Sequence, residues 1–225
     1  YLDDALAQYI ATSQNEEVKA ILTGRTAPAT PIRNPTSYTP EQTNTPNPYL
    51  GQVVAITSSK GGSGKSTVAI TLGTYLAHSS INSVKEGLEE RPLKVIIVDL
   101  DVRDGQIGFI TGSSKPTIVN LLLKGIEKET VEETVVHSSR LKCDLLLAPK
   151  KPRVSEDTPP EFYVELLQKL RYMYDYIILD TSVNYLDPLL EKVAYPTADQ
   201  IIFVSDIVIN SVFSMTRWIQ EVINP

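Results

Sequence analysis

The sequence predicts an α/β fold, a doubly wound, mostly parallel sheet with helices on both faces. Short apolar runs alternate with segments whose apolar residues recur at helical spacing. Each run is apolar throughout rather than at every second residue, which is typical of parallel strands buried on both faces. We expect strands at residues 53–57, 95–100, 144–148, 176–180 and 201–205. Helices are expected at residues 66–78, 118–140, 160–173, 187–195 and 210–223.

Composition limits the classes of protein that fit this chain. Of its 225 residues, 42% are hydrophobic, which is enough for one sizeable core. The net charge of −6 argues against a surface that follows a nucleic-acid backbone, so no specific nucleic-acid partner is expected. The single cysteine, Cys143, is expected to be a small buried residue in a reducing compartment, and no apolar stretch approaches the ~20 residues that span a bilayer. We therefore expect a cytoplasmic protein.

Changes of composition along the chain predict three parts. Apolar residues recur at helical spacing through residues 1–25, which we expect to be the tail of an upstream domain. Residues 26–50 are rich in Pro and Thr and are expected to form a linker, because such a segment buries little apolar surface. Residues 51–225 hold the strands and helices of the main domain. Because the chain begins at Tyr1 and ends just after a predicted helix, we expect a piece of a longer protein, with the main domain C-terminally incomplete.

A glycine-rich segment joins the first predicted strand to the first predicted helix. It reads Ser58-Ser59-Lys60-Gly61-Gly62-Ser63-Gly64-Lys65-Ser66-Thr67. Glycines let consecutive backbone N–H groups surround phosphate oxygens, and the start of the helix adds its partial positive charge. Lys65 is placed to neutralise the terminal phosphates, and Ser66 to ligate Mg²⁺. The segment from Lys60 to Thr67 is therefore predicted to bind a nucleotide.

Two further predicted strands end in aspartate. One carries Asp99 and Asp101 at its end, and the other ends in Asp180. The carboxyl ends of parallel strands meet at one edge of the sheet, which is the edge where the glycine-rich segment begins. Of the pair Asp99 and Asp101, one carboxylate can orient the shell of a Mg²⁺ ion and the other can face the γ-phosphate. The structural alternative is that these aspartates only cap or solvate the strand ends.

The glycine-rich segment resembles the deviant Walker A loop of the MinD/ParA superfamily of dimerising P-loop ATPases. It has Ser59 where the general loop has glycine, followed by a second lysine, Lys60. The resemblance covers about residues 52–224. It implies ATP and Mg²⁺ as cofactors, slow ATP hydrolysis, and a homodimer in which Lys60 reaches the nucleotide of the partner subunit.

The same resemblance implies a role for each aspartate. The residue that matches Asp99 supports the metal and Ser66, and Asp180, at the end of a Walker B-like strand, accepts a hydrogen bond from a Mg²⁺-bound water. The residue that matches Asp101 positions the attacking water. Lys60, Lys65 and Asp101 would thus be catalytic, and Ser66, Asp99 and Asp180 would surround the metal.

Within the superfamily, the chain most resembles the TadZ/CpaE branch, whose members help to localise and assemble type IV pilus and secretion machinery. The likeness lies in residues 101–108, 117–122, 145–149, 161–173 and 174–181. It implies a dimerising switch with pilus or secretion assembly proteins as partners. It also implies an upstream receiver-like domain, a place at the cell pole or the inner face of the membrane, and peripheral membrane association through partners.

Two other functions stay open. Residues 96–103 also fit the Asp-x-Asp-x-Arg motif of bacterial tyrosine kinases, although those kinases lack a lysine at the position of Lys60 and their tyrosine-rich tail is not found in this sequence. The second alternative is a scaffold that binds nucleotide without hydrolysing it. It stays open because Ser182-Val183-Asn184-Tyr185 replaces the Pro and Gly residues usual in the superfamily after the Walker B strand.

Overall fold

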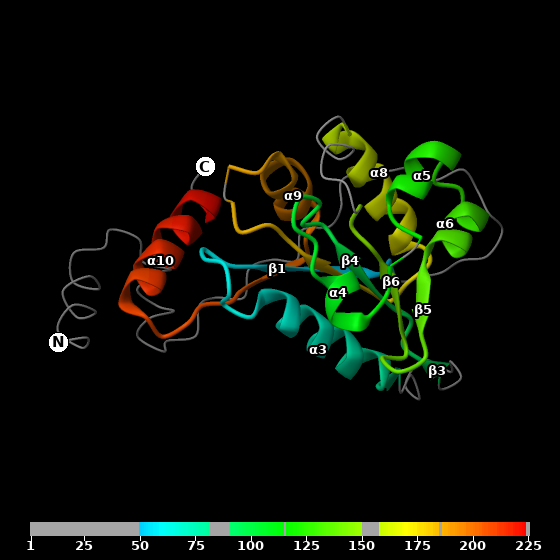
Figure 1. Cartoon of the computed structure of the whole chain (residues 1–225), viewed down its shortest axis with the longest axis horizontal. Coiled ribbons are helices and arrows are strands. Elements are labelled where there is room, and N and C mark those ends of the chain that lie inside the picture. Colours follow the sequence, from blue (N-terminus) through cyan, green and yellow to red (C-terminus); the bar gives the residue numbers. More distant parts are fainter. Residues whose placement is uncertain (1–49, 82–90, 115, 150–157, 185, 224–225) are drawn as a thin grey trace. The chain divides into compact units, whose positions relative to one another are not determined.

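The computed structural model describes residues 50–81, 91–114, 116–149, 158–184 and 186–223. The expected upstream helix and almost all of the expected linker lie outside the described residues. Within the described ranges the chain forms a six-stranded sheet in the order β5-β6-β4-β7-β1-β8. Helices cover both faces of this sheet (Figure 1). The predicted doubly wound, mostly parallel α/β fold is confirmed.

All neighbouring strands of this sheet are parallel except the edge strand β5, which pairs antiparallel with β6. The parallel strands are β1 (Gln52–Thr57), β4 (Val95–Asp99), β6 (Cys143–Leu146), β7 (Tyr176–Asp180) and β8 (Gln200–Phe203). Their ends lie within two residues of the predicted ones. The antiparallel strand is β5 (Val136–Ser138), and a separate two-stranded sheet pairs β2 (Ser80–Ile81) with β3 (Arg91–Pro92).

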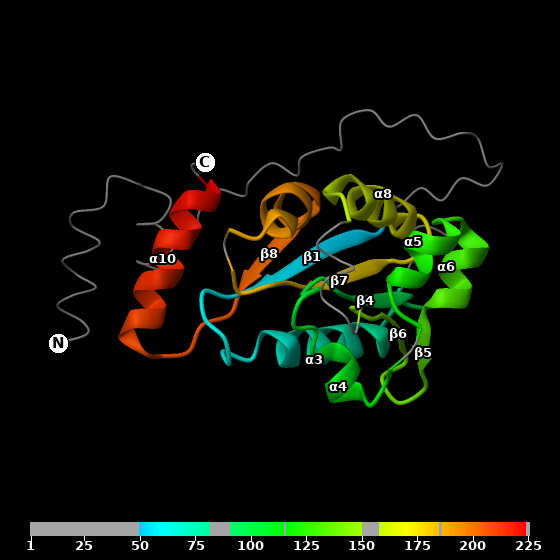
Figure 2. The ribbon, with the colours of Figure 1, turned by 45° about the horizontal axis from the view of Figure 1, so that its top comes forward.

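The helices form two layers, one on each face of the sheet (Figure 2). On one face lie α3 (Lys65–Ala77) and α4 (Ile107–Thr111). On the other lie α5 (Val119–Lys124), α6 (Lys128–Thr134), α8 (Pro160–Arg171), the π-helix η1 (Leu190–Ala194) and α9 (Tyr195–Thr197). The last described helix, α10 (Ile209–Ile223), follows β8.

The prediction of one helix over residues 118–140 is wrong. The chain instead forms α5, α6 and the strand β5. Helix α5 stops at Gly125, whose φ of 92° and ψ of 173° are far from helical values. Residues 136–138 become a strand because they find hydrogen-bonding partners at the open edge of β6, which lies further along the sequence. The two strands form a hairpin through the turn at residues 139–142, and the helical spacing of apolar residues did not reveal this pairing.

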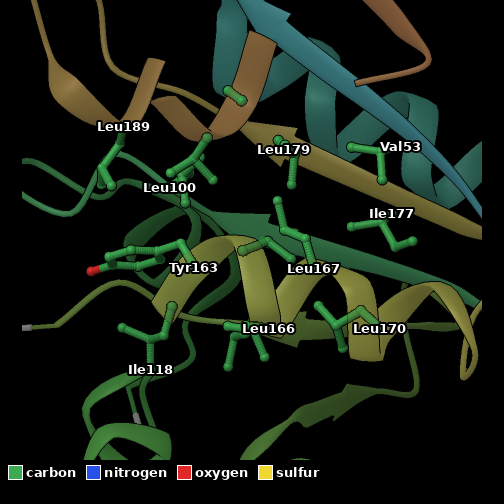
Figure 3. Close-up of a cluster of buried hydrophobic side chains, with 14 of the residues drawn as sticks. Val53, Leu100, Ile118, Tyr163, Leu166, Leu167, Leu170, Ile177, Leu179 and Leu189 are labelled. Atoms are coloured by element: carbon green, nitrogen blue, oxygen red, sulfur yellow. The ribbon is translucent and has the colours of Figure 1, made fainter. Parts of the chain in front are cut away.

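Two hydrophobic cores hold the layers together, because side chains alternate between the faces of each strand. Along β1, Val53 and Ala55 face one core while Val54 and Ile56 face the other. The first core receives fully buried residues of α8, and Figure 3 shows Leu166, Leu167 and Leu170 against the strands. The parallel strands are thus covered on both faces, as their continuous apolar sequences predicted.

Helix α3 lies unusually close to the sheet. A Cβ atom on Gly73, in the middle of α3, would lie 2.8 Å from the Cγ1 and Cδ1 atoms of Ile97 in β4. Only glycine fits this approach without displacing the Ile97 side chain. Tight packing fixes the start of α3, and therefore the glycine-rich segment before it, against the carboxyl ends of the strands.

Two further expectations from composition concern Cys143 and the membrane. Cys143 is buried at the start of β6, and burial raises the pKa of its thiol to about 12, so the thiol is protonated at neutral pH. In the part of the chain that the structure describes, no helix has both the length and the apolar character needed to cross a bilayer.

The packing of α8 against the sheet predicts that Leu167→Ala strongly destabilises the fold. Leu167 is 1% exposed in the first core, so its truncation should leave a cavity and lower the free energy of unfolding by about 2–5 kcal/mol. Urea unfolding of the 225-residue chain measures this change. On the exposed side of the same helix, Glu165→Ala should change stability by less than about 0.5 kcal/mol. Equal effects of the two variants would contradict the packing of α8.

Candidate functional site

The glycine-rich segment leaves the carboxyl end of β1 and turns into the first residue of α3. Gly62 and Gly64 have φ values of 78° and 93°, in the left-handed region where a side chain is strained. Gly64 is the N-cap residue of α3, and its carbonyl accepts a hydrogen bond from the Val68 N–H at 2.9 Å. No acidic residue lies in the first turn of α3. The partial positive charge of this helix end therefore faces the loop without a neutralising carboxylate from its own turn.

Lys65 and Asp180 form a buried ion pair where α3 meets the end of β7. The Lys65 Nζ atom lies 2.9 Å from Asp180 Oδ1, and the two side chains are 8% and 0% exposed. The other carboxylate oxygen, Asp180 Oδ2, is buried and has no hydrogen-bond partner among the described residues. A buried carboxylate oxygen without a donor is costly, so this atom points to a binding role.

Asp99, at the end of β4, is buried beside this pair. Strands β4 and β7 are in register, so Asp99 is the direct neighbour of Asp180. Its Oδ2 atom accepts a hydrogen bond from the Ile107 N–H at 3.1 Å, while Oδ1 is buried without a partner in the described ranges. Burial, and then the charge of Asp180, raise the pKa of Asp99 well above its usual value.

Asp101 lies just beyond the end of β4 and is only partly buried. Its backbone N–H donates to the Asp180 carbonyl at 3.1 Å, which ties the two loops together. Its Oδ1 atom accepts a long hydrogen bond, 3.3 Å, from the Asp104 N–H. Burial raises the pKa of Asp101, and the nearby charge of Lys65 opposes this shift. The structure therefore brings Asp99, Asp101, Asp180 and Lys65 together as predicted.

The remaining predicted residues lie along the loop and the first turn of α3. Gly61 and Gly62 are exposed, Ser63 and Ser66 are half-buried, and Thr67 is exposed. The Ser63 hydroxyl is buried and has no partner among the described residues. No contact recorded in those residues joins Ser66 to Asp99, so the predicted support of Ser66 by Asp99 stays a prediction.

Lys60 differs from the other predicted residues because it pairs away from Asp99 and Asp180. Its Nζ atom lies 3.0 Å from Asp206 Oδ2, in the loop between β8 and α10, and its side chain is 53% exposed. The preceding residue, Ser59, donates from its hydroxyl to the Ser211 carbonyl at 3.4 Å. The prediction that Lys60 reaches a partner subunit is not tested by a single chain.

Sequence reasoning missed two residues that shape this site. A Cβ atom on Gly105 would collide with the Cβ of Ala148 and lie 2.6 Å from Asp99 Oδ2, so glycine is required where this loop covers Asp99. Gly105 falls in the motif after β4, but only the packing reveals its role. Asp206 follows the end of β8, and the rule that found Asp101, an aspartate just after a strand, could have found it.

The residues present fit a Mg²⁺ ion bound together with a phosphate chain. The buried Asp99 Oδ1 and Asp180 Oδ2 atoms are hard oxygen ligands without donors, beside a loop that can hold phosphates. Among the described residues there is no cluster of three or more His, Cys, Asp or Glu side chains that could hold a metal alone. The small number of carboxylates fits Mg²⁺, which proteins usually coordinate with one or two carboxylates together with water and substrate phosphates.

Comparison with known proteins agrees with this geometry. The family AAA_31, described as an AAA domain, matches residues 51–224. The chain is similar to septum site-determining protein MinD of Synechocystis, with 24% identity over 58% of this chain and 45% of that protein. It is likewise similar to MinD of Bacillus subtilis, with 28% identity over 58% of this chain and 45% of that protein. The chain thus spans about half the length of the curated relatives it matches.

Solved structures share the fold at low sequence identity. A ParA family ATPase from Chlorobium tepidum has a TM-score of 0.61 and 20% identity, over 76% of this chain and 67% of that one. MinD of Pyrococcus horikoshii in complex with Mg-ADP has a TM-score of 0.59 and 20% identity, over 76% and 65%. The kinase domain of the Escherichia coli tyrosine kinase ETK has a TM-score of 0.56 and 19% identity, over 76% and 62%.

The raised pKa of Asp99 predicts that Asp99→Asn stabilises the nucleotide-free protein at neutral pH. Folded Asp99 holds its proton more tightly than the unfolded chain, so stability falls as pH rises above the ordinary value of 3.8 and through the raised pKa. Asparagine removes this loss. We expect the urea midpoint of the variant to exceed that of the parent near neutral pH. Between pH 4 and pH 8 the midpoint of the variant should also change less with pH.

Asp175, just before β7, provides the control, because its pKa is shifted in the opposite direction to that of Asp99. Burial acts to raise the pKa of Asp175, but hydrogen bonds from Arg91 at 2.6 and 2.7 Å and from the Lys94 N–H at 2.7 Å hold it below its usual value. The stability from these bonds is present above pH 3.8 and is lost as pH falls through the lowered pKa. Asp175→Asn should therefore destabilise at neutral pH, and a matching loss in Asp99→Asn would contradict the assignment.

Proposed function

Since the chain belongs to the AAA_31 family of AAA domains, within the MinD/ParA superfamily, we propose that it is a Mg-ATP-dependent switch ATPase that acts as a nucleotide-bound homodimer. The observation that carries this proposal is the buried Lys65–Asp180 pair, together with two carboxylate oxygens, Asp180 Oδ2 and Asp99 Oδ1, that have no partner among the described residues. A purely structural ion pair would satisfy those oxygens. Their lack of donors beside a phosphate-binding loop supports a site that is completed by a ligand.

The Lys65–Asp180 pair supports an exchange of partners when nucleotide binds. Lys65 is the only described side-chain partner of the buried Asp180 carboxylate. The β- and γ-phosphates of ATP would compete for the Lys65 ammonium, and Ser66, Asp99 and Asp180 would hold Mg²⁺. The ion, when bound, neutralises charge on the phosphates and on the leaving group. The exchange would leave both Lys65 and Asp180 beside an opposite charge.

Hydrolysis in this site would depend mainly on positioning. A water held by the partly buried Asp101 carboxylate would attack the γ-phosphorus, and the bond to the leaving ADP oxygen would break. Lys65 would stabilise the negative charge that develops on the phosphoryl oxygens. Lys60 of one subunit would complete the site of the other, so hydrolysis would require the homodimer. A slow rate fits a switch whose lifetime is set by hydrolysis.

For the biological role we propose a TadZ/CpaE-like switch that localises or organises a type IV pilus or secretion apparatus. Support comes from the resemblance of residues 101–108 and 174–181 to that branch. Its partners would be pilus or secretion assembly proteins. The protein would be cytoplasmic, at the cell pole or at the inner face of the membrane, where partners would provide peripheral association.

A bacterial tyrosine kinase is the second candidate. The fold similarity to the ETK kinase domain and Arg103 in the Asp-x-Asp-x-Arg motif favour it. Lys60 argues against it, since a lysine that closes the site would obstruct a tyrosine substrate. A scaffold that does not hydrolyse ATP is the third candidate. The segment after β7 favours it, because hydrogen bonds at 3.1 Å from Asn184 N–H to Ser182 Oγ and from Leu186 N–H to Asn184 Oδ1 hold that segment locally.

We expect Lys65→Ala to abolish Mg-ATP binding, because it removes the cation that offsets the phosphate charge. Isothermal titration of the 225-residue chain measures binding, and circular dichroism checks that the variant is folded, since Asp180 loses its buried partner. Lys60→Ala should bind Mg-ATP normally but fail to dimerise in light scattering. A folded Lys65→Ala protein with unchanged affinity would show that the loop is not the nucleotide site.

The acceptor of the γ-phosphoryl group separates the three candidates. We expect protein incubated with γ-labelled ATP and Mg²⁺ to release inorganic phosphate slowly and to retain no label on tyrosine. Asp101→Ala should lower phosphate release while the ATP-bound dimer persists, because water is no longer positioned. Near-stoichiometric phosphotyrosine by mass spectrometry, absent in Lys65→Ala, would establish the kinase. A dimer that never releases phosphate would establish the scaffold.

A further inference from the structure

Lys60, the first of the two lysines in the glycine-rich segment, forms an ion pair within its own chain. Lys60 Nζ lies 3.0 Å from Asp206 Oδ2, although 146 positions separate the two residues in the sequence. In the described ranges, no other acidic side chain is recorded within 4 Å of Lys60. A lysine that serves a partner subunit must therefore first leave an acidic partner in its own subunit.

The position of Asp206 is fixed by its surroundings. The Val204 N–H donates to the Thr57 carbonyl at 2.8 Å, which anchors the end of β8 beside the beginning of the glycine-rich segment. The Asp206 Oδ1 atom accepts from the Val208 N–H at 3.3 Å, while Oδ2 accepts from Lys60 Nζ at 3.0 Å. Asp206 therefore holds Lys60 from a structured turn.

Helix α10 gives this turn a rigid support. Trp218 of α10 is 5% exposed and makes edge-to-face contacts with the rings of Tyr195 and Phe203, at centroid distances of 6.5 and 6.2 Å. The second loop contact, from the Ser59 hydroxyl to the Ser211 carbonyl, also ends on α10. Of two consecutive loop residues, Ser59 thus contacts the first turn of this anchored helix and Lys60 contacts the turn that leads into it.

We propose that Asp206 restrains Lys60 in the nucleotide-free subunit and so opposes nucleotide-dependent dimerisation. The inference rests on the proposed function, in which Lys60 completes the site of the partner subunit. The Lys60 ammonium binds either the Asp206 carboxylate in its own chain or the phosphates across the interface. Both subunits of a dimer must break this contact, so the restraint enters the dimerisation equilibrium twice.

The size of the restraint follows from its exposure. The Lys60 and Asp206 side chains are 53% and 34% exposed, so the pair is weak and is screened by salt. Removing two such pairs per dimer should lower the dimer dissociation constant by about 2- to 30-fold. The restraint is thus large enough to lower the fraction of dimer at low ATP and small enough for phosphate binding to overcome.

Asp206→Asn is the sharpest test. Asparagine keeps an oxygen acceptor for the Val208 N–H, so the turn is preserved while the charge is lost. Sedimentation velocity of the 225-residue chain with Mg²⁺ and a non-hydrolysable ATP analogue should show a dimer dissociation constant about 2- to 30-fold lower than in the parent. The difference should shrink as salt rises from 50 to 500 mM.

Glu165→Gln is the matched control, because it makes the same change in net charge at an exposed position on α8. It should leave the dissociation constant unchanged, which excludes reduced repulsion between like-charged subunits as the cause. If Asp206→Asn dimerises as the parent does, or more weakly, the restraint is overturned while the switch stands. If the parent and the variant both bind the analogue but never dimerise, the proposed homodimer is overturned, and the restraint with it.

Discussion

The site depends on one buried ion pair, formed by Lys65 at the start of α3 and Asp180 at the end of β7. Side chains exposed by 8% and 0% hold opposite charges 2.9 Å apart, so neither can lose its partner without a large desolvation cost. This requirement fixes the first turn of α3 against the sheet. It also leaves Lys65 with a partner that a phosphate chain can replace, which is what a reversible nucleotide site needs.

The sheet places the other charges around this pair. Because β4 lies in register with β7, Asp99 and Asp180 are neighbours across the ladder, and their mutual repulsion adds to the effect of burial on the pKa of Asp99. Such an arrangement is unfavourable for an empty protein. It is favourable for a protein that binds a cation, because a Mg²⁺ ion relieves the repulsion. The nucleotide-free site therefore gives up stability for function.

The second lysine of the loop connects this edge of the sheet to the last described helix. Lys60 contacts Asp206, and Ser59 contacts Ser211, so the loop and the start of α10 are joined before any partner binds. Exposed ion pairs contribute little to stability. Their contribution is still large enough to bias an equilibrium between a single subunit and a dimer, because it counts once for each subunit. In the proposed switch, the loop would couple phosphate binding to self-association.

The sequence by itself determined where the parallel strands lie along the chain and where the glycine-rich loop lies, because continuous apolar runs and glycine spacing are local patterns. Since each candidate carboxylate lies at or just after the end of a parallel strand, it also predicted which charged residues gather at one edge of the sheet, namely Lys65, Asp99, Asp101 and Asp180. Only the tertiary structure decided the rest. Residues 136–138 formed a hairpin strand with β6 at the edge of the sheet, against a local helical pattern, because pairing with that edge satisfies their backbone groups. The Lys60–Asp206 contact joins residues 146 positions apart, and no local pattern specifies which side chains such a separation brings together.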